Sequence, residues 1–246
     1  MANMAEVLVE TLVAAGVKRV YGLAGDSLNG MTESIRKHKS IEWLHVRHEE
    51  VAAFVAGADA HVTNELAVCA GSCGPGNLHL INGLFDCHRN RVPVVAIAAQ
   101  IPSREIGSGY FQETHPEYLF KDCSHYCEVV SQPEQMPRVL AIAMRTAITK
   151  REVAVVVIPG DVALRECPTG PISLGIQNSA SVIRPSQQEL EKASEILNRA
   201  RKVTILGGAG CEGAHAELVA AAERLRHQLF TPCAAKSSSS TTILMT

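Results

Sequence analysis

Short apolar runs alternate with amphipathic segments along most of the chain. Strands are expected at 18–23, 41–46, 66–70, 93–98 and 153–158. Each is preceded by an expected helix, at 3–15, 27–38, 49–62, 76–88 and 133–150. The strands are continuous apolar runs, which is typical of a sheet that helices cover on both faces. The sequence therefore predicts an α/β fold with a doubly wound parallel sheet.

Doubly wound sheets bind ligands at the carboxyl ends of their strands. In this chain the loops at that edge are 24–27, 71–76 and 99–116. We therefore expect a functional site to draw on these three loops.

The chain changes character after Pro159, where prolines and glycines gather and the periodicity weakens. This change predicts a first domain over 1–165 and a linker over 166–185. Ser186, with Glu189 three residues later, is typical of a helix N-cap.

The start of a second, Rossmann-like α/β domain is predicted over 186–227. Its expected elements are a helix at 187–200, a strand at 202–206 and a helix at 214–226. Residues 228–246, with a serine run, do not continue this pattern.

Composition argues against two classes of function. The net charge is −2, and no basic stripe is interleaved with aromatic residues, so nucleic-acid binding has no electrostatic support. No apolar run approaches the length of a membrane span. The acidic N-terminal segment lacks the features of a signal peptide. We expect a cytoplasmic protein whose eight cysteines are mostly buried free thiols.

Cys123, His125 and Cys127 form a C-x-H-x-C pattern that invites a metal interpretation. Zinc sites normally use closely spaced cysteine pairs in loops, with a second pair elsewhere. We interpret these positions as one face of a half-buried strand, and the sequence predicts no metal site.

Glu49 is the candidate for proton chemistry, because it opens a small-residue helix beside the glycine-rich turn 71–76. Apolar surroundings of this kind retune a carboxylate for proton transfer. The alternative is that Glu49 is an ordinary acid in the first helical turn, which the helix N-terminus stabilises. We expect one of the two neighbours, Glu49 and Glu50, to have only this role.

Two glycine motifs leave alternatives open. One motif lies between a predicted strand and a predicted helix and consists of Gly208, Gly210 and Gly213. This context fits either a site for a dinucleotide pyrophosphate or a tight turn packed on its neighbour. The turn 71–76 lacks the lysine of a phosphate-binding loop, and only loosely matches the elbow of a serine hydrolase.

Five motifs in order carry a family resemblance: GDSLNG, RHEE, AGSCGPGN, FDCHRNRVPVVAIA and GSGYFQETHP. Together they resemble the N-terminal domain of thiamine-diphosphate-dependent decarboxylases, closest to bacterial pyruvate oxidases, also called quinone-dependent pyruvate dehydrogenases. The resemblance runs to about residue 227. Loop 107–116 favours the oxidase branch over the acetolactate synthase branch.

The resemblance implies a role for Glu49. The matching glutamate hydrogen-bonds the aminopyrimidine of the cofactor and promotes loss of the proton on the thiazolium carbon. The resemblance also implies pyruvate as substrate, with FAD and then a quinone as electron acceptors and acetate as product.

Other site residues are carried over by match. Gly25, Asp26 and Ser27 match a substrate-facing loop, and Phe111 and Gln112 match a pair that lines the reaction chamber. Three more match the turn beside the pyrimidine: Gly74, Pro75 and Asn77. Gly208, Gly210 and Gly213 would begin the FAD-binding domain.

The resemblance further implies a chain more than twice this long. In the family a third domain holds Mg²⁺ and the diphosphate, and the cofactor lies between subunits of a homo-oligomer, a homotetramer. The far C-terminus of the family associates peripherally with the inner membrane. This chain would supply one wall of the site, so we expect it to be inactive alone.

A one-nucleotide frameshift is our hypothesis for residues 228–246. Allowed codons for this segment, read in another frame, can encode a continuation that resembles the middle domain of the family. We therefore expect residues 228–246 to have no evolved function and not to fold with the preceding unit. A fragment of an acetolactate synthase and a non-catalytic thiamine-diphosphate-binding or interaction module remain as alternatives. A Rossmann dehydrogenase would rest on 208–213 alone.

Overall fold

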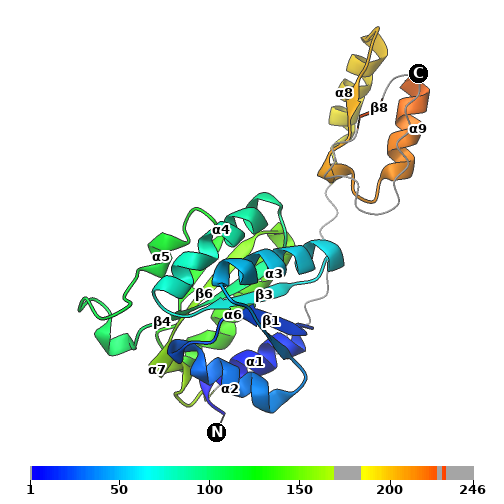
Figure 1. Ribbon diagram of the computed structural model, residues 1–246. Coiled ribbons are helices and arrows are strands. Elements are labelled where there is room, and N and C mark those ends of the chain that lie inside the picture. Colours follow the sequence, from blue (N-terminus) through cyan, green and yellow to red (C-terminus); the bar gives the residue numbers. More distant parts are fainter. Residues whose placement is uncertain (1, 169–183, 226–228, 231–246) are drawn as a thin grey trace. The chain divides into compact units, whose positions relative to one another are not determined.

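The computed structural model describes residues 2–168, 184–225 and 229–230 (Figure 1). It divides the chain into two compact units, Met1–Ser181 and Val182–Thr246. Each unit is described below by itself.

A six-stranded, fully parallel sheet forms the centre of the first unit (Figure 1). Its spatial order is β2-β1-β3-β4-β6-β5. The strands are β1 Arg19–Gly22, β2 Glu42–His45, β3 Ala67–Gly71, β4 Val94–Gln100, β5 Tyr126–Val129 and β6 Val153–Pro159. The expected α/β fold with a parallel sheet is confirmed.

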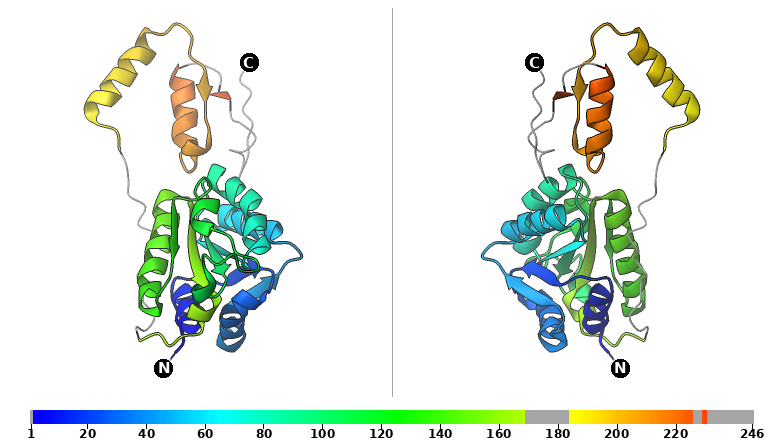
Figure 2. Two further views of the ribbon diagram at one scale, coloured as in Figure 1. Left: turned by 90° about the vertical axis from the view of Figure 1, so that its left-hand side faces the viewer. Right: turned by 90° about the vertical axis from the view of Figure 1, so that its right-hand side faces the viewer.

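Helices connect the strands and cover both faces of the sheet (Figure 2). They are α1 Met4–Ala14, α2 Asn29–His38, α3 Glu49–Thr63, α4 Pro75–Arg89, α5 Pro116–Leu119, α6 Met136–Lys150 and α7 Gly160–Ala163. Helices α1, α2 and α6 contribute to the hydrophobic core on one face, and α3 and α4 contribute to the core on the other.

The central strands are apolar on both faces because each face packs against helices. In β4, Val95 and Ile97 belong to the core beneath α1, α2 and α6, while Val94 and Ala96 belong to the core beneath α3 and α4. All seven residues of β4 and of β6 are buried. This arrangement explains why these strands read as continuous apolar runs in the sequence.

The sheet has its topological switch point between β1 and β3. From β1 the chain moves outward to β2, then returns to pair β3 against the other side of β1. The loops that follow β1 and β3 therefore lie at the carboxyl ends of these strands, on the two sides of the switch point, which is where this kind of sheet binds ligands.

Several expected elements need correction. The helices expected from residues 27 and 133 begin later, because residues 26–28 and 133–135 form 3₁₀ turns ahead of α2 and α6. The strand expected over the C-x-H-x-C pattern begins only at Tyr126, so Cys123 and His125 precede it. Tyr126 is the first residue of β5 in register with β6, where it lies opposite Ala154.

The second unit contains α8 Gln187–Arg199, β7 Ile205–Leu206, α9 His215–Leu225 and β8 Leu229–Phe230. Ser186 caps α8 by accepting a hydrogen bond from the backbone N–H of Glu189, as the sequence predicts. The strand expected at 202–206 is shorter, because only two residues pair with β8.

The expectation that residues 228–246 would stay out of the second unit is wrong for Leu229 and Phe230. These two residues pair in parallel with Ile205 and Leu206. Residue 228 and residues 231–246 lie outside the described part of the chain. Among the described residues, the helices are too short or too polar to cross a membrane.

Candidate functional site

Glu49 is the first residue of α3, and its side chain is only 7% exposed. His48 caps the helix, and its Nδ1 accepts the backbone N–H of Glu50 at 3.3 Å. The free N–H groups of the first helical turn favour a carboxylate here. The fold thus keeps an acid buried at the edge of an apolar core.

One oxygen of the Glu49 carboxylate is engaged by a neighbouring helix. Its Oε2 lies 3.1 Å from Nδ1 of His79, which is in the first turns of α4. The His79 ring stacks on His48, with ring centroids 4.2 Å apart. Since His48 and His79 come from different elements, the stack fixes the end of α3 against α4.

The other oxygen of Glu49 faces bare backbone. A Cβ added to Gly76 would lie 3.0 Å from Oε1 of Glu49 and 3.3 Å from Cβ of Ser72. Within the described residues, Oε1 of Glu49 has no hydrogen bond. One carboxylate oxygen therefore remains free to accept a hydrogen bond beside a glycine turn.

The loops after β1 and β3 meet at the switch point. Oγ of Ser27 lies 2.8 Å from Oγ of Ser72, and the backbone N–H of Cys73 donates to Oγ of Ser27 at 3.0 Å. A Cβ on Gly25 would lie 2.3 Å from Oγ of Ser72. The loops therefore approach so closely that position 25 excludes any side chain.

Gly74 and Gln112 join the third loop to this site. Gly74 has φ of +65°, and a Cβ there would lie 2.7 Å from Cβ of Gln112. Sγ of Cys73 donates weakly to Oε1 of Gln112 at 3.6 Å. Gln112 itself has φ of +65°. Two unusual backbone conformations thus allow loop 107–116 to pack onto the glycine turn.

Asn77 is fully buried in α4, and its Nδ2 donates to the carbonyl of Ala99 at 2.7 Å. Its Oδ1 has no hydrogen-bond partner among the described residues. Buried polar atoms are rarely left unpaired in folded proteins. Asn77 therefore ties α4 to the end of β4 and leaves one acceptor unused.

The remaining sequence-predicted residues are less enclosed. Asp26 and Pro75 are exposed, and Phe111 is 80% exposed. Gly208, Gly210 and Gly213 lie in the second unit, where an added Cβ on each would meet nothing within 4 Å. Of the three, only Gly213, at φ of +78°, needs glycine for its conformation.

Sequence reasoning missed His79 and Glu113. The pairing of His79 with Glu49 depends on how α3 packs against α4, and no motif marks it. Glu113 accepts hydrogen bonds from the backbone N–H groups of Gly107, Gly109 and Tyr110. These contacts, led by that of Gly107, hold the pKa of Glu113 below its usual value. The sequence signal that could have indicated this role is a pair of glycines, Gly107 and Gly109, followed by the acid Glu113.

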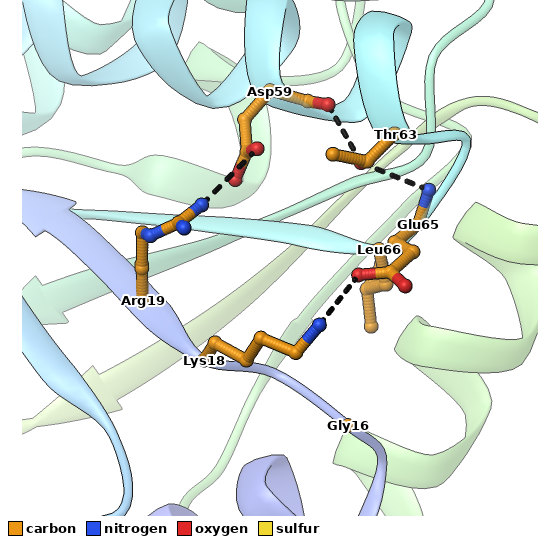
Figure 3. A pocket seen from close by; sticks show the side chains of 7 residues that line it. All are labelled: Gly16, Lys18, Arg19, Asp59, Thr63, Glu65 and Leu66. Carbon is orange, nitrogen blue, oxygen red and sulfur yellow. Dashed lines mark hydrogen bonds and ion pairs between the residues drawn. The ribbon is translucent and has the colours of Figure 1, made fainter.

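A separate pocket of about 100 Å³ lies between the start of β1 and the end of α3 (Figure 3). Its charges are already paired, Lys18 with Glu65 at 3.4 Å and Arg19 with Asp59 at 3.5 Å. Thr63 donates to the carbonyl of Asp59 and accepts the N–H of Glu65. This pocket offers a ligand few free polar groups and is not the candidate site.

Comparison with known protein families gives a match over the first unit. Residues 2–119 are similar to the family described as "Thiamine pyrophosphate enzyme, N-terminal TPP binding domain". The matched segment contains Glu49, the glycine turn 71–76 and loop 107–116.

Three relatives of this chain are longer proteins. An uncharacterized 42.6 kDa protein of Pseudomonas amyloderamosa is 62% identical over 92% of this chain and 58% of its own length. The pyruvate oxidase of Lactiplantibacillus plantarum is 32% identical over 93% of this chain and 38% of its own length. The large subunit of acetolactate synthase isozyme 2 of Escherichia coli is 32% identical over 85% of this chain and 37% of its own length. The chain therefore spans between about a third and three fifths of these relatives.

The residues present fit the aminopyrimidine half of thiamine diphosphate. An acceptor oxygen of Glu49 lies free beside Gly76, where a Cβ would fill the space. Asn77, the next residue of α4 after Gly76, supplies a buried acceptor atom, Oδ1, that has no partner among the described residues. A flat heteroaromatic ring with polar edges needs both a narrow slot and polar contacts of this kind.

Proposed function

We propose that this chain supplies the pyrimidine-binding wall of a thiamine-diphosphate- and FAD-dependent pyruvate oxidase, which converts pyruvate to acetate and CO₂ and passes electrons to a quinone. The observation that carries the proposal is the buried Glu49 carboxylate with one free oxygen against Gly76. The relative named pyruvate oxidase supports the choice of reaction.

In this proposal, Oε1 of Glu49 shares a proton with a ring nitrogen of the pyrimidine, which favours the imino tautomer of the ring. His79 holds Oε2 at 3.1 Å, which fixes the orientation of the carboxylate. Bound thiamine diphosphate would supply the carbanion chemistry and the electron sink that amino-acid side chains lack. Burial of Glu49 excludes water from the proton path.

The loops supply the substrate side. Gly25, Asp26 and Ser27 follow β1 at the switch point, and Gln112 packs on Gly74 at the same edge of the sheet. Phe111, which is 80% exposed, is proposed to close over pyruvate as an apolar wall. Gln112 is proposed as the polar contact.

The second unit is proposed as the start of an FAD-binding domain over 186–227. The order of β7, a glycine-containing turn and α9 supports this assignment, because a helix N-terminus after such a turn can accept a phosphate. In this proposal, Mg²⁺ and the diphosphate are held by a further domain of the family, and the complete site forms between subunits of a homotetramer.

Proton exchange at the thiazolium carbon tests the role of Glu49. In a complete enzyme that contains this domain, loaded with thiamine diphosphate and Mg²⁺, Glu49→Gln should keep the fold and slow the exchange by two or more orders of magnitude, about the loss expected when a general acid–base contact is removed. Glu50→Gln is the matched control, because the Glu50 side chain accepts from Asn82 instead, at 2.9 Å. Equal exchange in both variants would refute the assignment.

Product analysis separates the alternatives. In a complete enzyme that contains this domain, acetate and CO₂ from pyruvate, with reduction of a quinone, support the oxidase, whereas acetolactate would identify the synthase reaction for which the Escherichia coli relative is named. A protein that binds thiamine diphosphate yet exchanges the proton no faster than the free cofactor would be a non-catalytic binding module.

A further inference from the structure

A group of two histidines and one glutamate lies away from the thiamine-diphosphate site. His88 Nδ1 lies 2.6 Å from Oε2 of Glu152, and His125 Nδ1 lies 4.0 Å from the same oxygen. One donor atom from each residue lies within 4.8 Å of the others. We propose that His88, His125 and Glu152 bind a Zn²⁺ ion.

The three residues are held by regular backbone. His88 is in the last turn of α4, His125 directly precedes β5, and Glu152 directly precedes β6. The backbone N–H of His125 donates to the carbonyl of Val153 at 2.9 Å, and that of Glu152 donates to the carbonyl of Ala147 at 3.1 Å. Donors placed at the ends of packed elements keep their geometry better than donors on free loops.

This group occupies the amino edge of the sheet, where β5 and β6 begin. The thiamine-diphosphate site is built from loops at the carboxyl edge. The seven residues of β6 separate the two edges by about 20 Å, at roughly 3.3 Å for each residue. The proposed metal site therefore shares no residue with Glu49 and its neighbours.

The donor set suits zinc. Two imidazoles and one carboxylate are a common set for Zn²⁺ with one open position, and bonds of about 2.1 Å put the ligand atoms about 3.4 Å apart in a tetrahedron. The separations of 2.6 and 4.0 Å bracket that value. Shifts of under about 1 Å, within the reach of side-chain rotation, would complete the geometry.

The site is partly enclosed and open to one further ligand. The side chains of Glu152, His88 and His125 are 12%, 22% and 43% exposed. Solvent can therefore reach the group past His125 and supply a water as the fourth ligand. Arg151, the cation next to Glu152 in sequence, donates to Oδ1 of Asn64 at 3.2 Å. Its guanidinium group therefore has a hydrogen-bond partner other than Glu152.

Nearby thiols do not compete for the ion. Sγ of Cys87 donates to the carbonyl of Ala53 at 3.4 Å, and Sγ of Cys123 donates to that of Phe120 at 3.6 Å. Cys87 and Cys123 are both fully buried. Of the C-x-H-x-C pattern, only His125 contributes, and its partners are distant in sequence.

The ion would fasten α4 to the starts of β5 and β6. The proposal assigns it a structural role at this edge of the sheet. Binding to the folded state alone raises the midpoint of thermal unfolding in proportion to the logarithm of the free zinc concentration.

Zinc titration of the whole chain tests the proposal. Metal-free protein with reduced thiols should bind one equivalent of Zn²⁺ by calorimetry. His125→Ala removes a half-exposed side chain, so the fold should survive, as circular dichroism would verify, and the Kd should rise more than about tenfold. Glu152→Gln keeps the shape of the side chain and should also weaken binding.

Two control variants locate the ion. His115→Ala removes an exposed histidine whose Nδ1 lies 3.7 Å from a single carboxylate, that of Glu117, and should leave the Kd unchanged. His79→Ala alters the other group of two histidines and a glutamate, at His48 and Glu49, and should also leave the Kd unchanged.

Three results would overturn the proposal. These are the absence of zinc binding by folded wild-type protein, an unchanged Kd in His125→Ala, and loss of binding in His79→Ala. Substitution with Co²⁺ gives an independent measure, since visible bands without an intense thiolate charge-transfer band fit nitrogen and oxygen ligands, and a thiolate band would contradict them.

Discussion

The Oε1 atom of Glu49 lies 3.0 Å from the point where Gly76 would carry a Cβ. Gly76 is the second residue of α4, and Glu49 is the first residue of α3. The absence of a side chain at position 76 thus sets how much room the carboxylate has. This relationship explains why glycine is present at position 76, which helix formation alone does not explain.

Gly76→Ala should therefore separate stability from chemistry. Alanine is favoured over glycine in a helix by about 1 kcal/mol, which offsets the crowding, so the free energy of unfolding should change by less than about 1 kcal/mol. The added methyl should displace the Glu49 carboxylate and slow proton exchange at the thiazolium carbon by about ten- to a hundredfold. Gly208→Ala, where nothing lies within 4 Å, should change neither quantity. Exchange at the wild-type rate in Gly76→Ala would contradict this steric account.

Gly83→Ala should instead destabilise the first unit. A Cβ at position 83 would lie 2.4 Å from Cβ of Ala53, 2.8 Å from the backbone N of Phe54 and 2.9 Å from the carbonyl O of Glu50. Because two of these atoms belong to the α3 backbone, the helices must move apart. We expect a loss of about 2 kcal/mol in the free energy of unfolding.

Urea unfolding followed by tryptophan fluorescence measures this loss in the first unit, because Trp43, in β2, is the single tryptophan of the chain. Gly210→Ala is the control, with no neighbour within 4 Å and an expected change under about 0.5 kcal/mol. Equal midpoints for the two variants would show that α3 and α4 are not packed as closely as described.

Glu113→Gln should loosen loop 107–113. The Glu113 carboxylate accepts the N–H of Gly109 at 2.7 Å and that of Tyr110 at 3.1 Å, and an amide is a weaker acceptor. Chymotrypsin should cut after Tyr110 or Phe111 faster in this variant at neutral pH. Glu117→Gln, outside the loop, should be cut at the wild-type rate, and the same rate in Glu113→Gln would argue against the role of Glu113.

The same contacts predict a pH dependence. Hydrogen bonding by the N–H of Gly107, then by those of Gly109 and Tyr110, lowers the pKa of Glu113. A lowered pKa means that the order of the loop is fully present above the ordinary glutamate value of about 4.3 and is lost as the pH falls through the lower folded value. The amide resonance of Gly109 should therefore titrate with a midpoint below about 4.3, and a midpoint above that value would contradict the contacts.

Cys69 should resist alkylation. Burial in β3 is the main cause that raises the pKa of Cys69 well above its usual value, so thiolate is scarce at pH 8. Because the folded pKa is raised, this thiol stabilises the fold below about pH 8.5, the unfolded value, and the contribution is lost as the pH rises further. Peptide mapping after iodoacetamide treatment should find Cys211, which is partly exposed, modified before Cys69. Faster modification of Cys69 in folded protein would contradict its burial.

The sequence alone determined the order and type of the main elements. Apolar runs such as 93–98 are buried on both faces, so the sequence pattern predicts these strands of the sheet directly. It also marked Glu49 and the glycine turn, because a helix-start acid and a bare turn are local features. Local sequence patterns do not show which strands pair. For this reason the strand near Cys127 was placed too early and the pairing of Leu229 was not expected.

The tertiary structure decided which distant residues meet. The packing of α3 on α4 brings His79 to Glu49, and the parallel pairing of β5 and β6 brings His125 toward Glu152, which also contacts His88 on α4. Their sequence separations carry no periodic signal, because contacts between elements depend on sheet order and helix packing. Sequence therefore fixes where each donor sits on its own element, and only the folded sheet sets which donors share a site.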